Sequence, residues 1–154
     1  MKLLTKEIIK RLPKLYSTEN VPRPEKICVC KFFTPWTYWT WYVVEGSRQE
    51  DGDWLFFGLV EGDETEWGYF LLSGLESIRG HLLIGGRKSK DYLTIERDLH
   101  HFGDGKMFKE FHHAFRKEEE WPNDPVDPLD GPSKADIENI HNRIQNKIKG
   151  GLIW

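Results

Sequence analysis

The sequence lacks long apolar runs, a strong charge of either sign and more than two cysteines. No stretch approaches the ~18–20 apolar residues that cross a bilayer, and the charged opening MKLLTKEIIKR differs from the apolar core of a signal peptide. We therefore expect no membrane segment and a cytoplasmic protein. The 22 Lys and Arg residues against 25 Asp and Glu give a net charge of −3, which disfavours a strongly basic nucleic-acid binder and an acidic DNA mimic.

The two cysteines form a C-x-C pair, Cys28 and Cys30, within an apolar segment. On a strand these side chains would share one face, because residues i and i+2 point the same way. The pair is too close in sequence for an ordinary structural disulfide and too small for a zinc site. The sequence predicts two buried, reduced thiols and no cofactor.

Aromatic residues are abundant: seven Trp, nine Phe and five Tyr among 154 residues. The segment WTYWTW at 36–41 is too rich in rings for all of them to face one core, because alternate side chains of an extended segment leave opposite faces. Exposed Trp and Tyr side chains are strong anchors in protein interfaces. We therefore predict a binding surface at Trp36, Tyr38 and Trp39; a covering helix is the structural alternative.

Hydrophobic patterning predicts an α+β fold with an antiparallel sheet of four or five strands and an N-terminal helix. Thr5 is the expected N-cap of that helix, and Pro13 is expected to end it. Short turn-rich links between the strands exclude parallel pairing, which needs long crossovers. The expected strands are residues 26–33, 39–45, 54–60 and 66–72, and residues 92–99 either return as a fifth strand or lie across the sheet. The expected core includes Phe32, Trp41, Phe56, Phe57, Tyr69, Leu71 and Leu75.

Helices are expected after the sheet. Ser73 and Glu76 have the S-x-x-E spacing of a capping box for a short helix. Phe108, Phe111 and Phe115 share one helical face within residues 106–120. These elements complete a single domain over residues 1–120.

The carboxyl-terminal region is predicted to be an extension. Residues 121–132 are a proline-rich linker, and residues 133–154 form an amphipathic helix. Its apolar stripe contains Ile137, Ile140, Ile144 and Ile148, of which the last three are predicted binding residues. The stripe would pack on the chain's own sheet, on a partner, or on a second copy as a homodimer.

Three groups of polar residues are candidates for chemistry. Glu66, Glu76, Arg79, Glu96, Arg97 and Asp98 could serve acid–base catalysis, but no nucleophile, phosphate loop or metal motif accompanies them, and a structural ion network explains them equally. Arg87, Lys88 and Lys90 lie in a glycine-containing segment, residues 81–90, which is expected to be a flexible loop or a hairpin and could contact phosphates. The pairs His100-His101 and His112-His113 could each offer one good metal ligand, and we predict no metal site. His112 is expected at the rim of the phenylalanine face. Arg87, Lys88, Arg97 and Asp98 are retained as binding candidates.

Several motifs resemble a family of small bacterial proteins catalogued as a domain of unknown function. They include KLYSTE at 14–19, KFFTPW at 31–36, FFGLV at 56–60, WGYFLL at 67–72 and IERDLH at 95–100. The resemblance spans about residues 1–100, and it implies carriage on plasmids, phages and integrative elements but no activity. The segment 81–94 is longer than the resemblance leads us to expect. Residues after about 102 are expected to extend beyond the family.

We conclude from the sequence that the protein is a non-enzymatic protein-interaction module of a mobile genetic element. Its expected partner is a host or element protein, and inhibition of a host defence protein is one form of this hypothesis. The alternative is a small enzyme or nucleic-acid-binding protein that uses the Glu/Arg/Asp group or the basic loop at 87–90.

Overall fold

The computed structural model describes residues 1–101, 103–115 and 142. The predicted linker, the C-terminal helix and its isoleucines 140, 144 and 148 lie outside these residues. The elements are α1 (Lys6–Arg11), η1 (Arg23–Glu25), β1 (Cys30–Phe33), β2 (Thr40–Arg48), β3 (Trp54–Glu61), β4 (Thr65–Leu71), α2 (Leu72–Ser77), β5 (Arg79–Gly80), β6 (Leu83–Ile84), β7 (Arg87–Lys88), β8 (Leu93–Thr94), β9 (Glu96–Arg97), α3 (Phe108–Phe111) and η2 (His113–Phe115).

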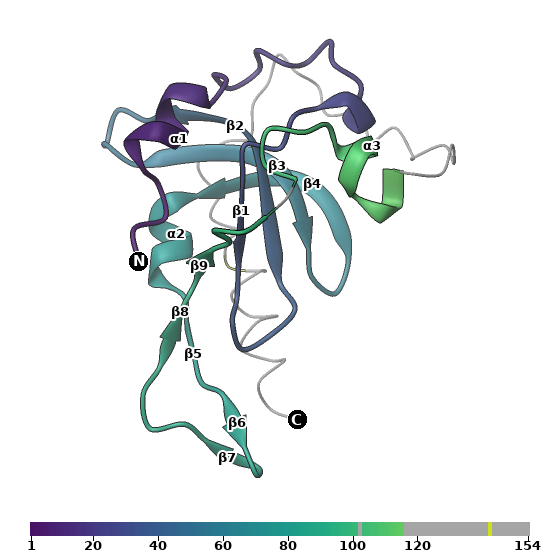
Figure 1. Cartoon of the computed structure of the whole chain (residues 1–154). Helices are drawn as coiled ribbons and strands as arrows, with labels where there is room; N and C mark the ends of the chain where they lie inside the picture. Colours follow the sequence, from purple (N-terminus) through teal and green to yellow (C-terminus); the bar gives the residue numbers. More distant parts are fainter. Residues whose placement is uncertain (102, 116–141, 143–154) are drawn as a thin grey trace.

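A five-stranded sheet in the order β4-β3-β2-β1-β9 organises the domain. Every neighbouring pair is antiparallel, and short helices pack beside the sheet, which confirms the α+β class (Figure 1). Four strands overlap the segments that the apolar patterning predicted, but β1 begins at Cys30 and not at residue 26. The fifth predicted strand, 92–99, is divided between β8 and β9, and only β9 joins the main sheet, beside β1.

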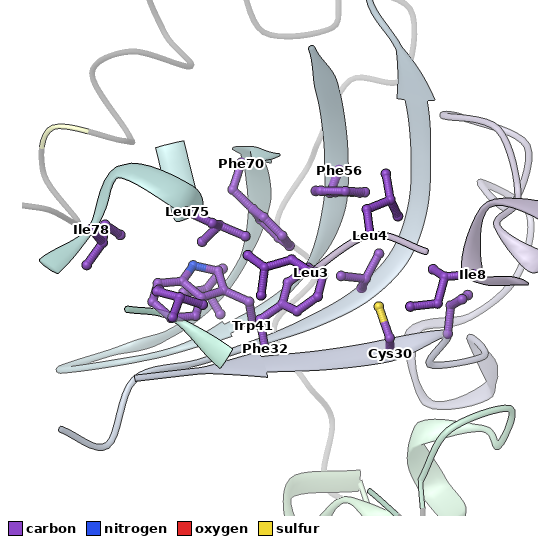
Figure 2. Close-up of a cluster of buried hydrophobic side chains, with 14 of the residues drawn as sticks. Leu3, Leu4, Ile8, Cys30, Phe32, Trp41, Phe56, Phe70, Leu75 and Ile78 are labelled. Carbon is purple, nitrogen blue, oxygen red and sulfur yellow. The ribbon is translucent and has the colours of Figure 1, made fainter. Parts of the chain in front are cut away.

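Both faces of the sheet are covered, which explains the nearly continuous apolar runs of its central strands. One face carries Phe32, Trp41 and Phe56, and packs beneath α2 and the N-terminal segment (Figure 2). The other face carries Tyr42, Leu59 and Trp67, and packs against α3 and η2. Six of the seven predicted core residues are buried, and Leu71 is half-buried.

The N-terminal helix begins where the sequence predicted. The side chain of Thr5 accepts a hydrogen bond from the Ile8 N–H at 3.3 Å, and α1 ends at Arg11, before Pro13. Leu3, Leu4 and Ile8 are buried in the core (Figure 2). This segment therefore closes one face of the sheet.

The predicted capping box at Ser73 is wrong. Ser73 lies inside α2, whose N-cap position is Leu71, and no side chain caps this helix. Instead, the Ser73 hydroxyl donates a hydrogen bond to the carboxylate of Asp53. This long-range partner makes Ser73 a link between α2 and the start of β3.

The two cysteines are buried and free, as predicted, but they do not share a face. Cys30 belongs to the core beneath α2, whereas Cys28 belongs to the core beneath α3. The i, i+2 rule fails because β1 begins only at Cys30, so Cys28 precedes the regular strand. None of the helices in the described part of the chain has the length and apolar character needed to cross a membrane.

Candidate functional site

A two-stranded arm, residues 79–94, projects from the body of the molecule (Figure 1). Its base is the antiparallel pair β5–β8, and its tip is the hairpin β6–β7. Gly85 and Gly86 join the hairpin strands and both have positive φ, of 59° and 78°, which favours glycine. The sequence predicted a loop or hairpin here, and the structure shows a hairpin.

Exposed apolar side chains concentrate on this arm. Leu82, Leu83, Ile84 and Tyr92 are 41%, 44%, 68% and 61% exposed. Arg87 and Lys88, two predicted binding residues, are exposed on β7 directly opposite Ile84 and Leu83. The arm therefore presents apolar and basic side chains together.

The predicted aromatic binding surface is mostly interior. Trp39 is 5% exposed, with its ring centroid 6.0 Å from that of Trp41, so it is not an accessible anchor. Trp36 is half-buried and packs against the core, where Gly80 leaves space for its ring. Tyr38 alone is exposed, at 60%, and its hydroxyl donates to Asp63.

Three residues of the Glu/Arg/Asp group, Arg79, Arg97 and Asp98, contact different segments of the chain. The Arg97 guanidinium donates to the carbonyl oxygens of Lys2 and Leu3 at 2.8 and 2.9 Å, and so fixes the N-terminal segment. Asp98 forms an ion pair with Lys31 at 3.5 Å. Arg79 donates to the carbonyl oxygens of Glu76 and Ile78, and lies over the ring of Tyr92. These contacts give the three side chains structural roles.

Two polar groups instead flank the buried ring of Tyr42, on the sheet face beneath α3. His101 and His112 contact this ring with centroid distances of 5.7 and 5.2 Å. His112 is buried, which corrects its predicted position at the rim of the phenylalanine face. Each histidine belongs to a separate set of three side chains whose ligand atoms lie within 4.8 Å of one another: Cys28, His101 and Asp104; and Glu61, His112 and His113.

In the set of Glu61, His112 and His113, hydrogen bonds determine which nitrogen of His112 carries a proton and lower the pKa of Glu61. The Ala114 N–H donates to His112 Nδ1 at 3.3 Å, so Nε2 carries the proton that His112 donates to Glu61. Thr40 also donates to the Glu61 carboxylate, at 3.2 Å. Burial acts to raise the pKa of Glu61, but these hydrogen bonds and the nearby histidines outweigh it and lower the pKa.

In the set of Cys28, His101 and Asp104, burial shifts the pKa of all three side chains. Burial raises the pKa of the Cys28 thiol, and the neighbouring Cys30 and Asp104 add to this effect. Burial and the charge of Lys31 lower the pKa of His101 to about 4. Burial raises the pKa of Asp104 to about 6. At neutral pH the set therefore contains a thiol, a neutral imidazole and a carboxylate.

Sequence reasoning missed both sets because each combines two neighbouring residues with a third from a distant segment of the chain. The histidine pairs were noticed, but nothing local shows that Cys28 and Glu61 lie opposite them. The H-x-x-D spacing of His101 and Asp104 was the available signal, since a tight turn brings residues i and i+3 together.

Comparison with known proteins identifies one family to which the domain is similar. Searches of curated proteins and of solved structures gave no match. Residues 3–119 match the family described as "Protein of unknown function (DUF2958)". The match continues through α3 and η2, so these elements belong to the family domain. The expectation that residues after about 102 extend beyond the family is therefore wrong. Because the match covers most of the chain, this protein belongs to the DUF2958 family of proteins of unknown function.

Proposed function

We propose that this protein is a non-enzymatic protein-interaction module, acting in the cytoplasm, that binds its partner through the arm at residues 79–94. The observation that carries the proposal is the exposed apolar tip formed by Leu82, Leu83 and Ile84. An accessible apolar patch on a projecting element is typical of a recognition surface.

The tip of the arm has no buried side chain, although Ser89 connects its two strands through hydrogen bonds with Leu82. Each of its paired strands is two residues long, and β6 and β7 are exposed throughout. A short hairpin without a packed face is only marginally stable in water. Burial of Leu83 and Ile84 against a partner would supply the missing contacts, at about 25 cal/mol per Å² of apolar surface removed from water.

The positive charge of the arm favours one class of protein partner. The arm carries four basic side chains, Arg79, Arg87, Lys88 and Lys90, and one acid, Asp91, whereas the whole chain has a net charge of −3. Complementary charges at the rim of an interface promote encounter and fix orientation. The expected partner is therefore a protein with an apolar depression bordered by acidic residues. The apolar tip favours protein over nucleic acid, whose phosphates would contact only the basic side chains.

The family resemblance supports a biological setting for the proposed interaction. Carriage on a plasmid or phage would place the partner among host or element proteins. Occupying a host defence protein, and so inhibiting it, is the form that we propose.

Quantitative co-purification with arm variants tests this function. The full chain and the double variant Leu83→Asp/Ile84→Asp are expressed at equal levels in the native host, and bound proteins are quantified by mass spectrometry. Tyr38→Ala, which removes an exposed ring on the body, is the matched control. We expect a stoichiometric partner with the wild type and the control, and at least about tenfold less with the double variant, equivalent to ~1.4 kcal/mol.

Two outcomes would contradict the proposal. Equal recovery of the partner with the double variant would exclude the arm. Recovery of nucleic acid that high salt removes, with no protein partner, would favour the nucleic-acid alternative.

A further inference from the structure

We propose that Cys28, His101 and Asp104 form a binding site for a divalent transition metal of the zinc class. Their ligand atoms, one from each side chain, lie within 4.8 Å of one another. A tetrahedral zinc ion holds sulfur, nitrogen and oxygen ligands roughly 3.3–3.8 Å apart, given bond lengths of about 2.0–2.3 Å. Binding would require the side chains to rotate until the three atoms reach that separation.

Backbone hydrogen bonds hold the three residues together. The Asp104 N–H donates to the His101 carbonyl oxygen at 3.1 Å, which closes the turn that pairs these residues. The Gly105 N–H donates to the Cys28 carbonyl oxygen at 2.7 Å, and the Cys28 N–H donates to Lys106 at 3.0 Å. The turn is thus bound to the segment before β1, independently of any ligand.

Two glycines make this close approach feasible. Gly105 has a φ of 77°, which other residues rarely adopt. A Cβ atom at Gly103 would lie 2.6 Å from His101 Nε2 and 2.7 Å from the Phe111 ring. A larger residue at 103 would therefore displace the imidazole from its position beside Cys28.

The Asp104 carboxylate has a buried oxygen without a hydrogen bond in the described part of the chain, which points to a bound ligand. Its Oδ1 atom is buried and has no hydrogen-bond partner among the residues that the structure describes. Leaving a buried acceptor unsatisfied costs about 1–3 kcal/mol, and more for a charged group. A cation held between Oδ1, the thiol sulfur and the imidazole would satisfy this oxygen.

The donor set suits zinc better than magnesium or calcium. Thiolate and imidazole ligands favour zinc-class ions, whereas magnesium and calcium prefer sites made of oxygen. Binding would release the Cys28 thiol proton to solvent, so that the thiolate, the carboxylate and the dication sum to zero charge. A neutral site is compatible with this buried location, and the fourth ligand position would be left for water.

Alternative roles fit less well. A nucleophilic cysteine needs access and a lowered pKa, but Cys28 is 0% exposed and burial raises the pKa of its thiol. The neighbouring group of Glu61, His112 and His113 offers no sulfur, and the His112 nitrogen facing Glu61 carries a proton. The first set is therefore the better metal site.

Titration of the untagged, full-length chain with Co²⁺ and Zn²⁺ tests the proposal. Cobalt bound by a thiolate gives a sulfur-to-metal charge-transfer band, which reports coordination by cysteine directly. We expect one equivalent of Co²⁺ to produce this band, and one equivalent of Zn²⁺ to abolish it with a Kd at or below about 10 µM.

Matched variants identify the ligands. Cys28→Ala should lose the band, and Asp104→Asn should weaken Zn²⁺ binding at least tenfold. Cys30→Ala, which removes the thiol on the opposite face of the sheet, should keep the charge-transfer band and the Zn²⁺ affinity of the wild type. Circular dichroism shows whether each variant is folded.

The wild-type titration is decisive even if a variant fails to fold. Absence of the charge-transfer band in the wild type would overturn the proposal. Cobalt binding without that band, abolished by His113→Ala, would also overturn it and assign the ion to the Glu61 group.

Discussion

Glu45 shows how a single residue connects distant segments. Its side chain is buried, and its carboxylate accepts hydrogen bonds from the Tyr16 N–H at 2.8 Å and the Thr18 N–H at 3.0 Å. The register shift between Val43 and Glu45 places Val44 as an extra residue in β2, so Glu45 and Phe57 form a cross-strand pair. This β-bulge re-aims the carboxylate toward the loop that contains Tyr16, whose φ is 67°.

Replacing Glu45 by Ala should lower the free energy of unfolding by about 2–3 kcal/mol. The physical reason is that two backbone N–H groups would lose their charged acceptor while remaining partly buried. Chemical denaturation measures the effect, and Glu50→Ala, at an exposed position two residues beyond β2, is the control. An equal, small change in both variants would show that the Glu45 hydrogen bonds do not stabilise the loop.

Asp104 should destabilise the metal-free protein in a pH-dependent way. Its pKa in the folded state is about 6, above the ordinary value of 3.8, so its protonated form favours folding. The stability from this group is complete below pH 4 and is lost as the pH rises through 6. Asp104→Asn avoids that loss because it carries no charge at any pH.

Thermal denaturation in the presence of a chelator measures this effect. The melting temperature of Asp104→Asn should exceed that of the wild type at pH 7.5, and the difference should shrink toward pH 4. Asp91→Asn, which removes an exposed carboxylate, controls for the loss of one charge. A difference independent of pH would contradict the raised pKa.

At the scale of elements, the central hairpins depend on close backbone packing. Gly58 and Gly68 form a directly opposed pair on β3 and β4, but their surroundings differ. A Cβ atom at Gly58 would lie 1.8 Å from the Tyr42 carbonyl oxygen, whereas one at Gly68 would have nothing within 4 Å. Gly58 therefore allows β2 and β3 to approach beside the bulge.

Gly58→Ala should cost more than about 3 kcal/mol, because backbone atoms must move to admit the methyl group. Gly68→Ala is its matched control and should change the free energy of unfolding by less than about 1 kcal/mol. Urea denaturation of both variants provides the comparison. Similar midpoints for the two variants would show that β2 and β3 can separate without loss of stability.

These elements also show what a sequence can predict. The positions of β2, β3 and β4 follow from apolar and β-branched runs between turn formers, which are local signals. The true partner of Ser73 is Asp53, twenty residues away, and the face of Cys28 depends on where β1 begins. The convergence of Cys28, His101 and Asp104 depends in the same way on long-range pairing, so local spacing could not reveal it.

At the scale of the whole molecule, the described residues close both cores themselves. Leu3 and Ile8 cover one face of the sheet, and Phe108, Phe111 and Phe115 cover the other. The arm lies outside both cores (Figure 1). The body therefore holds the arm in the exposed position that the proposed interaction requires.

Deletion of residues 120–154 should leave a folded domain. All the described residues of the two cores precede position 116, and we expect the buried apolar surface that they form to be enough to stabilise the truncated chain. Circular dichroism should show the same strand signal, with a cooperative thermal transition. Loss of that transition would show that the C-terminal region completes the core, whereas loss of self-association alone would support the predicted dimer helix.

Hydrogen–deuterium exchange on the native complex tests the central claim, that the arm binds the partner. Amides of a marginal, exposed hairpin exchange rapidly when it is free and slowly when a partner covers it. We predict that binding slows exchange at residues 82–89 and leaves the face of α3 unchanged. Unchanged exchange in the arm, with protection elsewhere on the body, would contradict the account.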